Sequence, residues 1–347
     1  MINQAKHIEK VYRTSDEHID RSNYLRLDKN ERIKPFSANF LNTLREKVND
    51  EVITMYPDPE PLYQRLAEWL GIDRKCLYLS SGSEYSIKAI FEAFMDRKDK
   101  ILLHSPSYAM YNVYSDVYGV KQTTLEYKED LSFNLNEYTS MIDSSYKMVV
   151  LENPNGFIGN SYRLQDIIGF LDATLKHSVL AVIDEAYFHF YPITALELIL
   201  KYENLCVVRT FSKAFGLAGV RFGYLVAQSK IVQSILKVRP MHEINSFSIM
   251  LGLHCLENLE EMNDFIKEVH KSKAYTIDGL KKKGIEVRNS DTNFILVKFP
   301  EGIDVQKCLF DEGILVRRPF TQKFLKGWTR VTIGSSSQMK EMIKLIG

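Results

Sequence analysis

The chain has 347 residues, which is enough for one large α/β domain or for two domains of ordinary size. Its 45 lysines and arginines almost balance its 44 aspartates and glutamates, so the net charge is only +1. This balance gives no electrostatic reason to expect nucleic acid or an anionic membrane as a partner. No apolar run approaches the roughly 20 residues that a membrane-spanning helix needs.

The cysteines and the N-terminus point to the reduced interior of the cell. The four cysteines lie far apart and form no CxxC pair and no metal-ligand spacing, so no bound metal is expected. The polar stretch 1–20 has no hydrophobic signal core. These features predict a soluble cytoplasmic protein.

Short apolar runs alternate with helical patterns between about residue 76 and residue 227. The expected strands span residues 76–80, 100–105, 147–152, 179–186, 205–211 and 222–227. This alternation predicts an α/β fold with a mainly parallel central sheet. Because the strands are apolar at successive positions, we expect helices on both faces of the sheet.

The pattern changes after residue 230. A long helical stretch is expected over about 243–283, followed by strands over 292–299, 313–318 and 329–334. These elements predict a separate, smaller α+β layer, and segment 1–45 is expected to join it because it contains few core residues. The resulting division is a large domain over residues 46–239 and a discontinuous small domain over residues 1–45 and 240–347.

Polar residues follow several expected strands, and ligands of open α/β sheets bind beyond the carboxyl ends of the strands. After the first strand, Gly82 allows a tight turn, and the backbone N–H groups of Ser83 and Glu84 then open a helix that can cradle a phosphate. After the second strand, Tyr108 begins a helix, where its ring could stack on a planar ligand. Each signal alone also fits an ordinary turn or ordinary packing.

Two further strands end in polar residues. The third is followed by ENPNGFIG, whose Asn153 and Asn155 fit turn chemistry. The fourth carries Asp184 at the end of a run so apolar that the carboxylate needs a partner, and a protonated pyridine nitrogen is one. His104 and His189 lie near strand ends and are assigned structural roles.

The stretch 209–224, RTFSKAFGLAGVRFGY, contains the fifth expected strand end. Its Lys213 can form a Schiff base, while Thr210, Ser212 and Arg221 offer donors for a phosphate. A phosphate cradle, a stacking ring, a carboxylate for a pyridinium and a reactive amine are what pyridoxal 5′-phosphate requires from a protein. The ordered set therefore predicts a site for this cofactor.

On these motifs the sequence resembles the fold-type I, pyridoxal-phosphate-dependent aminotransferases of the class I/II group, and their histidinol-phosphate branch in particular. The resemblance runs from LDKNE (27–31) through TRVTIG (329–334), and its most specific part is T-x-S-K-x(5)-G-x-R-x-G at 210–223. It implies the aspartate aminotransferase-like fold of the PLP-dependent transferases, with a large and a small domain, and a homodimer with shared active sites.

The resemblance also assigns roles to single residues. Lys213 would bind the cofactor covalently and act as the base, Asp184 would bind the pyridine nitrogen, and Tyr187 would bond the ring hydroxyl. Tyr56 would reach the cofactor phosphate of the neighbouring subunit. The other implied cofactor contacts are stacking by Tyr108 and phosphate binding by the backbones of Ser83 and Glu84 and the side chains of Thr210, Ser212 and Arg221.

Two arginines near the C-terminus resemble substrate-binding positions of the family. Arg330 in TRVTIG matches the arginine that binds a substrate carboxylate or an equivalent anion. Arg317 in ILVRRP matches the position that contacts a substrate phosphate in the histidinol-phosphate branch, and Arg318 fits less well. Together they favour an anionic, phosphorylated substrate.

The sequence departs from the family pattern in two places. Where relatives carry N-P-N-N-P-T-G, this chain has NPNGFIG, so the asparagine that usually bonds the cofactor's ring oxygen aligns with Gly156. Asn155 could take over that contact, or Tyr187 alone could make it. LDKNERIKPF also departs from the usual N-E-N-P. Both departures weaken the histidine-pathway assignment more than they weaken cofactor binding.

Three functions follow from this interpretation. The first is transfer of an amino group between an amino acid donor and a small phosphorylated keto or amine compound. The second is decarboxylation of a phosphorylated amino acid with the same cofactor. The third, a nucleotide-binding or regulatory protein, is disfavoured because Gly216, Gly219 and Gly223 lack the G-x-G-x-x-G spacing, and because the sequence before the first expected strand is too short and too neutral to suggest a DNA-binding domain.

Overall fold

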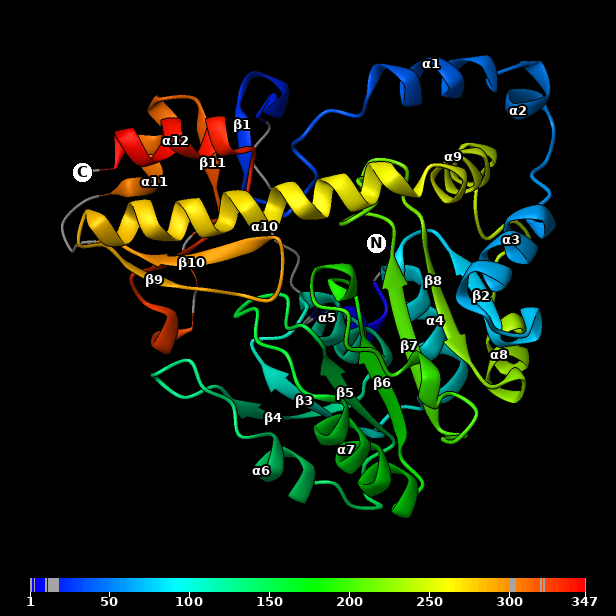
Figure 1. The fold of residues 1–347 in the computed structure, drawn as a ribbon. Helices are drawn as coiled ribbons and strands as arrows, with labels where there is room; N and C mark the ends of the chain where they lie inside the picture. Colours follow the sequence, from blue (N-terminus) through cyan, green and yellow to red (C-terminus); the bar gives the residue numbers. More distant parts are fainter. Residues whose placement is uncertain are drawn as a thin grey trace.

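A seven-stranded sheet forms the centre of the molecule (Figure 1). The computed structural model describes residues 2, 4–9, 11, 19–299, 304–318, 320 and 322–346, so the polar N-terminal stretch lies largely outside the described residues. The strand order is β2-β8-β7-β6-β5-β3-β4. The strands are β2 (Leu77–Ser80), β3 (Lys100–Ser105), β4 (Lys121–Glu126), β5 (Met148–Glu152), β6 (Leu180–Asp184), β7 (Leu205–Thr210) and β8 (Gly223–Ala227).

The sheet is mainly parallel, as predicted. Strands β4, β3, β5, β6 and β7 pair in parallel, and β8 lies antiparallel between β7 and β2. The carboxyl ends of the parallel strands therefore meet at one edge, which brings the residues that follow them together. Strand β4 was not predicted; it is an edge strand with polar residues and mostly exposed side chains.

Helices cover both faces of the sheet, which confirms that prediction. Alternate strand side chains pack against α4, α5 and α8 on one face and against α3, α6 and α7 on the other. The helices are α3 (Glu60–Leu70), α4 (Ser83–Phe94), α5 (Ala109–Tyr118), α6 (Leu135–Ser140), α7 (Leu164–Lys176) and α8 (Ser229–Leu236).

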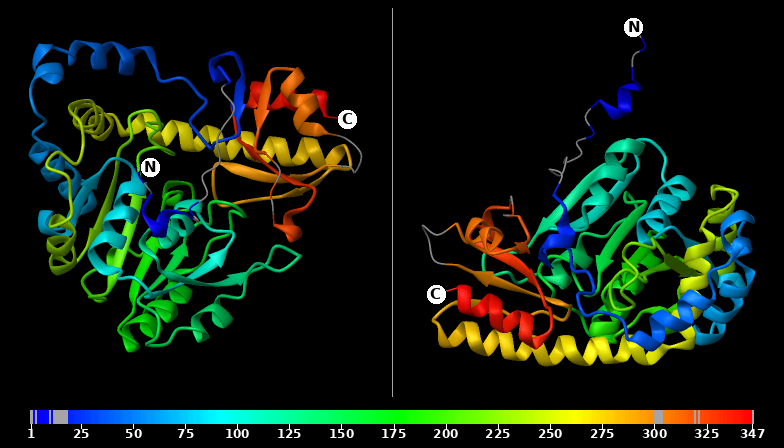
Figure 2. Two further views of the ribbon diagram at one scale, coloured as in Figure 1. Left: turned by 180° about the vertical axis from the view of Figure 1, so that it is seen from behind. Right: turned by 90° about the horizontal axis from the view of Figure 1, so that it is seen from above.

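The expected helical stretch over 243–283 is divided into α9 (Ser246–Glu257) and α10 (Leu259–Lys282). The break is at Asn258, whose φ of −128° and ψ of 54° are not helical. Helix α10 is 24 residues long and runs from the central part of the molecule along the C-terminal layer (Figures 1 and 2). That layer contains the antiparallel strands β9 (Glu286–Arg288), β10 (Phe294–Lys298) and β12 (Trp328–Thr332), and the helices α11 (Val305–Asp311) and α12 (Ser336–Leu345).

An N-terminal segment joins this C-terminal layer. Strand β1 (Leu25–Leu27) pairs in parallel with β11 (Ile314–Val316), which places Leu25 opposite Ile314. Such pairing is what the predicted discontinuous small domain requires. The domain bounds at residues 45/46 and 239/240 stay a prediction. Helices α1 (Ala38–Glu46) and α2 (Asp50–Thr54) then lead to α3. Within the described residues, no helix is both long enough and apolar enough to cross a bilayer.

Candidate active site

A cavity of about 380 Å³ lies at the edge where the parallel strands end. The predicted site residues line it, except Asn155 and Tyr56. The lining residues are Lys29, Ser83, Glu84, Tyr108, Ala109, Glu152, Pro154, Gly156, Phe157, Asp184, Ala186, Tyr187, Thr210, Ser212, Lys213, Arg221, Arg317 and Arg330. Residues predicted from five separate places along the chain therefore meet in one pocket.

One corner of the pocket is built around the N-terminus of α4. Gly82 precedes the helix with a φ of +82°, and a Cβ atom there would lie 2.8 Å from Arg221 Nη2. A Cβ atom on Gly223 would lie 2.4 Å from the backbone nitrogen of Ser83. Glycine at both positions thus lets Arg221 and strand β8 approach the free N–H groups of the helix. Unpaired N–H groups, hydroxyls and a guanidinium form a site suited to a phosphate.

Asp184 ends β6 at the base of the pocket and is 5% exposed. Its Oδ2 accepts a hydrogen bond from the Tyr111 hydroxyl at 3.0 Å, and its Oδ1 accepts one from the Ala186 backbone N–H at 3.1 Å. Burial, reinforced by the nearby charge of Glu152, raises the pKa of Asp184 to about 7 despite these bonds. A cationic ring nitrogen in the pocket would favour the charged carboxylate, so this residue fits the pyridine of the cofactor.

Lys213 lies in the irregular connection between β7 and β8. Its Nζ donates a hydrogen bond to the Lys29 carbonyl at 3.0 Å and lies 5.5 Å from the centre of the Tyr187 ring. The Tyr187 hydroxyl in turn accepts a 2.7 Å hydrogen bond from the side-chain amide of Asn30. Sequence reasoning assigned no role to Asn30, although it lies within LDKNE, where the family resemblance begins.

Tyr108 precedes the first residue of α5, where the sequence placed it. It is 37% exposed and lines the pocket. Its ring lies edge-on to Tyr111, with the ring centres 6.4 Å apart. One face of the aromatic ring can therefore serve as a stacking surface for a planar ligand.

Two arginines and an aromatic ring form another part of the pocket. Arg330 donates from Nη1 to the Gly156 carbonyl at 2.7 Å, and its buried Nε has no hydrogen-bond partner among the described residues. Burial lowers the pKa of Arg330 to about 10. The guanidinium carbons of Arg317 and Arg330 each lie 5.8 Å from the centre of the Phe157 ring. Arg318 is exposed and is not part of the described lining.

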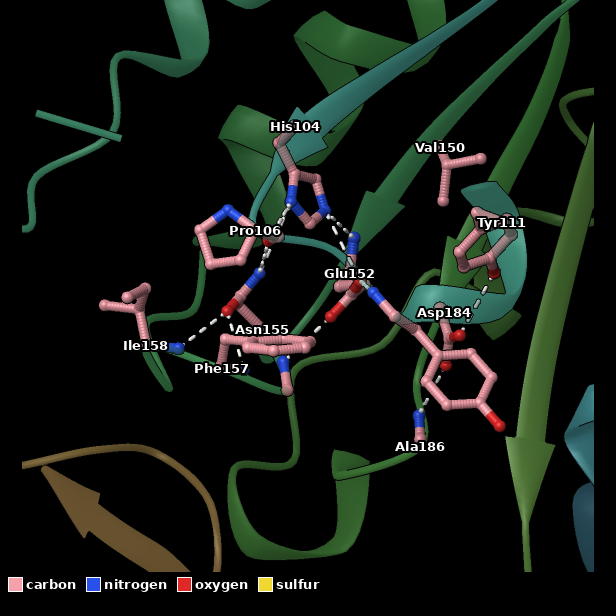
Figure 3. Close-up of polar contacts among 12 residues, drawn as sticks. His104, Pro106, Tyr111, Val150, Glu152, Asn155, Phe157, Ile158, Asp184 and Ala186 are labelled. Atoms are coloured by element: carbon pink, nitrogen blue, oxygen red, sulfur yellow. Dashed lines mark hydrogen bonds and ion pairs between the residues drawn. The ribbon is translucent and has the colours of Figure 1, made fainter. Parts of the chain in front are cut away.

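Asn155 is fully buried and is not part of the pocket lining. Its Oδ1 accepts hydrogen bonds from the backbone N–H groups of Phe157 at 2.8 Å and Ile158 at 2.7 Å, and its Nδ2 donates to the Pro106 carbonyl at 3.3 Å (Figure 3). The expected shift of Asn155 toward the cofactor is not compatible with this placement, because the amide holds the turn together. Tyr56 is 82% exposed, so its expected contact with a neighbouring subunit stays a prediction.

Glu152 is a pocket residue that sequence reasoning missed. It ends β5, is 3% exposed, and accepts hydrogen bonds from the backbone N–H groups of Tyr108 and of Gly156, the latter at 2.8 Å. Burial raises the pKa of Glu152 to about 7, opposed by these two bonds and by the charge of Arg330. The signal was present, because Glu152 ends an apolar strand just as Asp184 does.

The fold and this site define a pyridoxal-phosphate-dependent transferase, since the pocket combines an amine, a buried carboxylate, an aromatic surface and an anion cradle. The family model of aminotransferase class I and II matches residues 26–346. The chain therefore belongs to the class I and II aminotransferases. It is a pyridoxal-phosphate-dependent aminotransferase.

Individual relatives agree with this assignment. The chain is 36% identical over 316 residues to a histidinol-phosphate aminotransferase of Thermoanaerobacter pseudethanolicus, which covers 89% of this chain and 88% of that protein. It is 32% identical over 326 residues to that of Clostridium novyi, covering 93% and 90% respectively. The solved structure of histidinol-phosphate aminotransferase from Sinorhizobium meliloti in complex with pyridoxal-5′-phosphate superposes with a TM-score of 0.88 at 21% identity, over 100% of this chain and 98% of that chain.

These relatives bear on the alternatives raised from the sequence. They carry the name of an aminotransferase and give no support to a decarboxylase. Membership of the aminotransferase family likewise sets aside a nucleotide-binding regulator.

Proposed function

We propose that the enzyme transfers an amino group between an amino acid and a small phosphorylated compound of the histidinol phosphate type. The observation that carries this proposal is the presence of two cationic regions in one pocket. Arg221 belongs to the cradle at the N-terminus of α4, and Arg317 and Arg330 flank Phe157. The first region matches the phosphate of the cofactor, which leaves the second for an anionic substrate. The relatives, which are named histidinol-phosphate aminotransferases, support the same substrate class.

The roles proposed for the chemistry follow from the positions of four side chains. When bound, pyridoxal phosphate supplies an electron sink for the substrate carbon that loses its proton. Lys213 would hold the cofactor covalently, and its free amine would move the proton at the substrate Cα. Asp184 keeps the ring nitrogen protonated, Tyr187 bonds the ring hydroxyl, and Tyr108 stacks on the ring.

The remaining proposed contacts concern the two phosphates and the assembly. Arg317 and Arg330 bind the anionic groups of the substrate. We propose that the enzyme is a cytoplasmic homodimer in which Tyr56 of each subunit reaches the cofactor phosphate of the other. Each subunit has a large domain over residues 46–239 and a small domain over residues 1–45 and 240–347. The cofactor phosphate is held by the backbone N–H groups of Ser83 and Glu84 and by the side chains of Thr210, Ser212 and Arg221.

The test compares two substrates that differ only in the phosphate. Purified enzyme loaded with pyridoxal phosphate is given histidinol phosphate or histidinol with a keto acid acceptor, and amino acid formation is followed. Because a buried charged hydrogen-bonded pair contributes about 2–5 kcal/mol, kcat/KM for the phosphorylated amine is expected to be at least about 30-fold higher. Equal kcat/KM values would overturn the phosphorylated substrate, and failure of the keto acid acceptor to become an amino acid with either amine would overturn transamination. The Lys213→Ala variant should be inactive on both.

A further inference from the structure

We infer that Glu152 replaces the missing family asparagine: as a neutral carboxylic acid it donates a hydrogen bond to the ring oxygen of the cofactor. The inference rests on the site proposed above and adds a residue that the family pattern does not supply. It starts from a gap in that pattern. Gly156 has no side chain, and the amide of Asn155 already bonds to backbone groups of Phe157, Ile158 and Pro106.

Glu152 occupies the space into which an asparagine at position 156 would extend. A Cβ atom added to Gly156 would lie 3.3 Å from Glu152 Oε2 and 3.3 Å from Tyr187 Cε2. The carboxyl group is therefore close to the ring that carries the Tyr187 hydroxyl, the other group proposed to bond the ring oxygen. Glycine at position 156 and glutamate at position 152 thus form a complementary pair, because a side chain at 156 would crowd the carboxyl group.

The hydrogen bonds of Glu152 fix its orientation and leave it able to donate. Oε1 accepts from the Tyr108 N–H and Oε2 from the Gly156 N–H, so each oxygen has one backbone partner (Figure 3 shows the surrounding contacts). A protonated carboxyl group keeps one O–H donor beyond these two bonds. The donor is then held on the wall of the pocket by the start of α5 and by the turn at Gly156.

The surroundings of Glu152 favour the protonated form. Glu152 lies opposite Asp184 in the register of β5 and β6, and two buried carboxylates so near each other disfavour a second negative charge. A pyridinium would keep the charge on Asp184 and leave the proton to Glu152. His104, whose Nε2 lies 3.9 Å from Glu152 Oε1, adds no positive charge because burial lowers its pKa to about 4.

Among the described residues, the other ionisable groups near Glu152 include the cation Arg330 and several tyrosines. Arg330 from β12 is the cation that favours the ionised form of Glu152. Burial raises the pKa values of the tyrosine hydroxyls, which therefore stay neutral near pH 7. These tyrosines are Tyr108 just before α5, Tyr111 of α5, Tyr127 after β4, Tyr138 of α6 and Tyr162 before α7.

The test measures cofactor affinity in a double-mutant cycle. Pyridoxal phosphate is titrated into cofactor-free wild type, Glu152→Ala, Gly156→Asn and the double variant. Loss of a hydrogen-bond donor should raise the Kd of Glu152→Ala by about 10- to 100-fold. Gly156→Asn alone should also weaken binding through crowding, whereas in the Glu152→Ala background it should restore the Kd to within about fivefold of wild type, because the asparagine then has room.

If Glu152 had a purely structural role, the double variant would not recover cofactor affinity. The two substitutions would then weaken binding additively, and this result would overturn the inference. Glu126→Ala, an exposed glutamate at the end of β4, is the control and should bind as wild type does. Thermal unfolding of each cofactor-free variant separates lost affinity from lost folding.

A second variant covers the case in which Glu152→Ala does not fold. Relative to Glu152→Gln, wild type should lose affinity as the pH rises through about 7, where Glu152 loses its proton. Glu152→Gln keeps a neutral donor, so this pH-dependent loss should disappear. An unchanged pH dependence would overturn the inference. Absorbance separates failure of this inference from failure of the proposed site. If the proposed site is wrong, wild type will lack the absorbance band of lysine-bound cofactor, whereas if only this inference is wrong, wild type will show the band and Lys213→Ala will lose it.

Discussion

The side-chain amide of Asn30 donates a 2.7 Å hydrogen bond to the Tyr187 hydroxyl, although the two residues are 157 positions apart. Asn30 is fully buried and has a left-handed φ of 56°. Its Oδ1 also accepts from the Thr332 hydroxyl at 3.0 Å, and its carbonyl accepts from Asn293 at 3.0 Å. One residue thus connects Tyr187 at the pocket to the strands of the C-terminal layer.

Asn30→Ala should lower the free energy of unfolding of the cofactor-free protein by about 2–4 kcal/mol, because buried polar partners lose their bonds and alanine is strained in the left-handed region. Asn30→Gly removes the same bonds without that strain and should lose less stability. The comparison is made by chemical denaturation. The exposed Asn23→Ala serves as control, and a loss in Asn30→Gly as large as in Asn30→Ala would contradict the backbone argument.

Two glycines of the same motif should respond differently to alanine. A Cβ atom on Gly223 would meet backbone atoms at 2.4–2.9 Å, whereas a Cβ atom on Gly219 would meet nothing within 4 Å. Gly223→Ala must therefore push β8 away from the start of α4, which should cost about 1–3 kcal/mol of stability and weaken cofactor binding. Gly219→Ala should leave both within error. Unfolding curves and cofactor titrations check this, and equal effects at the two positions would refute it.

Asp184 should give the cofactor-free protein a characteristic pH dependence. Burial raises its pKa to about 7 in the folded protein, while an aspartate in an unfolded chain titrates near pH 4. Between these values the folded protein holds a proton that the unfolded chain has lost. The stabilisation from this proton is complete below about pH 4 and is lost as the pH rises to about 7.

Asp184→Asn removes that titration, so the stability of the variant relative to wild type should rise between about pH 4 and about pH 7 and then level off. Thermal unfolding of the cofactor-free proteins measures the difference. The exposed carboxylate variant Glu341→Gln should follow wild type across this range. A constant offset between Asp184→Asn and wild type would contradict the raised pKa.

The neighbouring arginines at 317 and 318 provide a matched pair. Arg317 lines the pocket beside Phe157, whereas Arg318 is exposed. Arg317→Met should therefore lower kcat/KM for the phosphorylated substrate by about 10- to 100-fold, mainly through KM, because a charged hydrogen bond to the anion is lost. Arg318→Met should stay within about twofold. Steady-state kinetics decide, and a larger loss at Arg318 would reverse the assignment.

The sequence predicted the elements whose side chains are buried on both sides. The strands that end at Glu152, Asp184 and Thr210 are buried throughout and begin with apolar runs, so their pattern is clear without any tertiary information. Strand β4 escaped prediction because it is polar and lies at the edge of the sheet, and β1 because its three residues are held by pairing with β11. Both depend on neighbours distant in the chain.

The candidate site was predicted where a residue type and a strand end coincided, as for Lys213 and Asp184. Asn155 was expected to contact the cofactor, but it lies outside the pocket lining, and its side-chain oxygen accepts hydrogen bonds from the backbone of its own turn. A sequence pattern does not show whether an asparagine bonds to its own turn or to a ligand. Asn30 required knowledge of a contact across 157 positions. Glu152 needed no such knowledge, since the argument used for Asp184 applied to it equally.

The pocket draws its parts from two sheets. Lys213 and Asp184 follow strands of the central sheet, whereas Arg330 comes from β12 of the C-terminal layer. Under the roles proposed above, the residues that carry out amino-group transfer and the arginine that recognises the anionic group of the substrate are encoded in separate regions of the gene. Mutations in the C-terminal layer can therefore exchange one substrate for another while the reaction itself is preserved, which gives this architecture a simple route to new metabolic tasks.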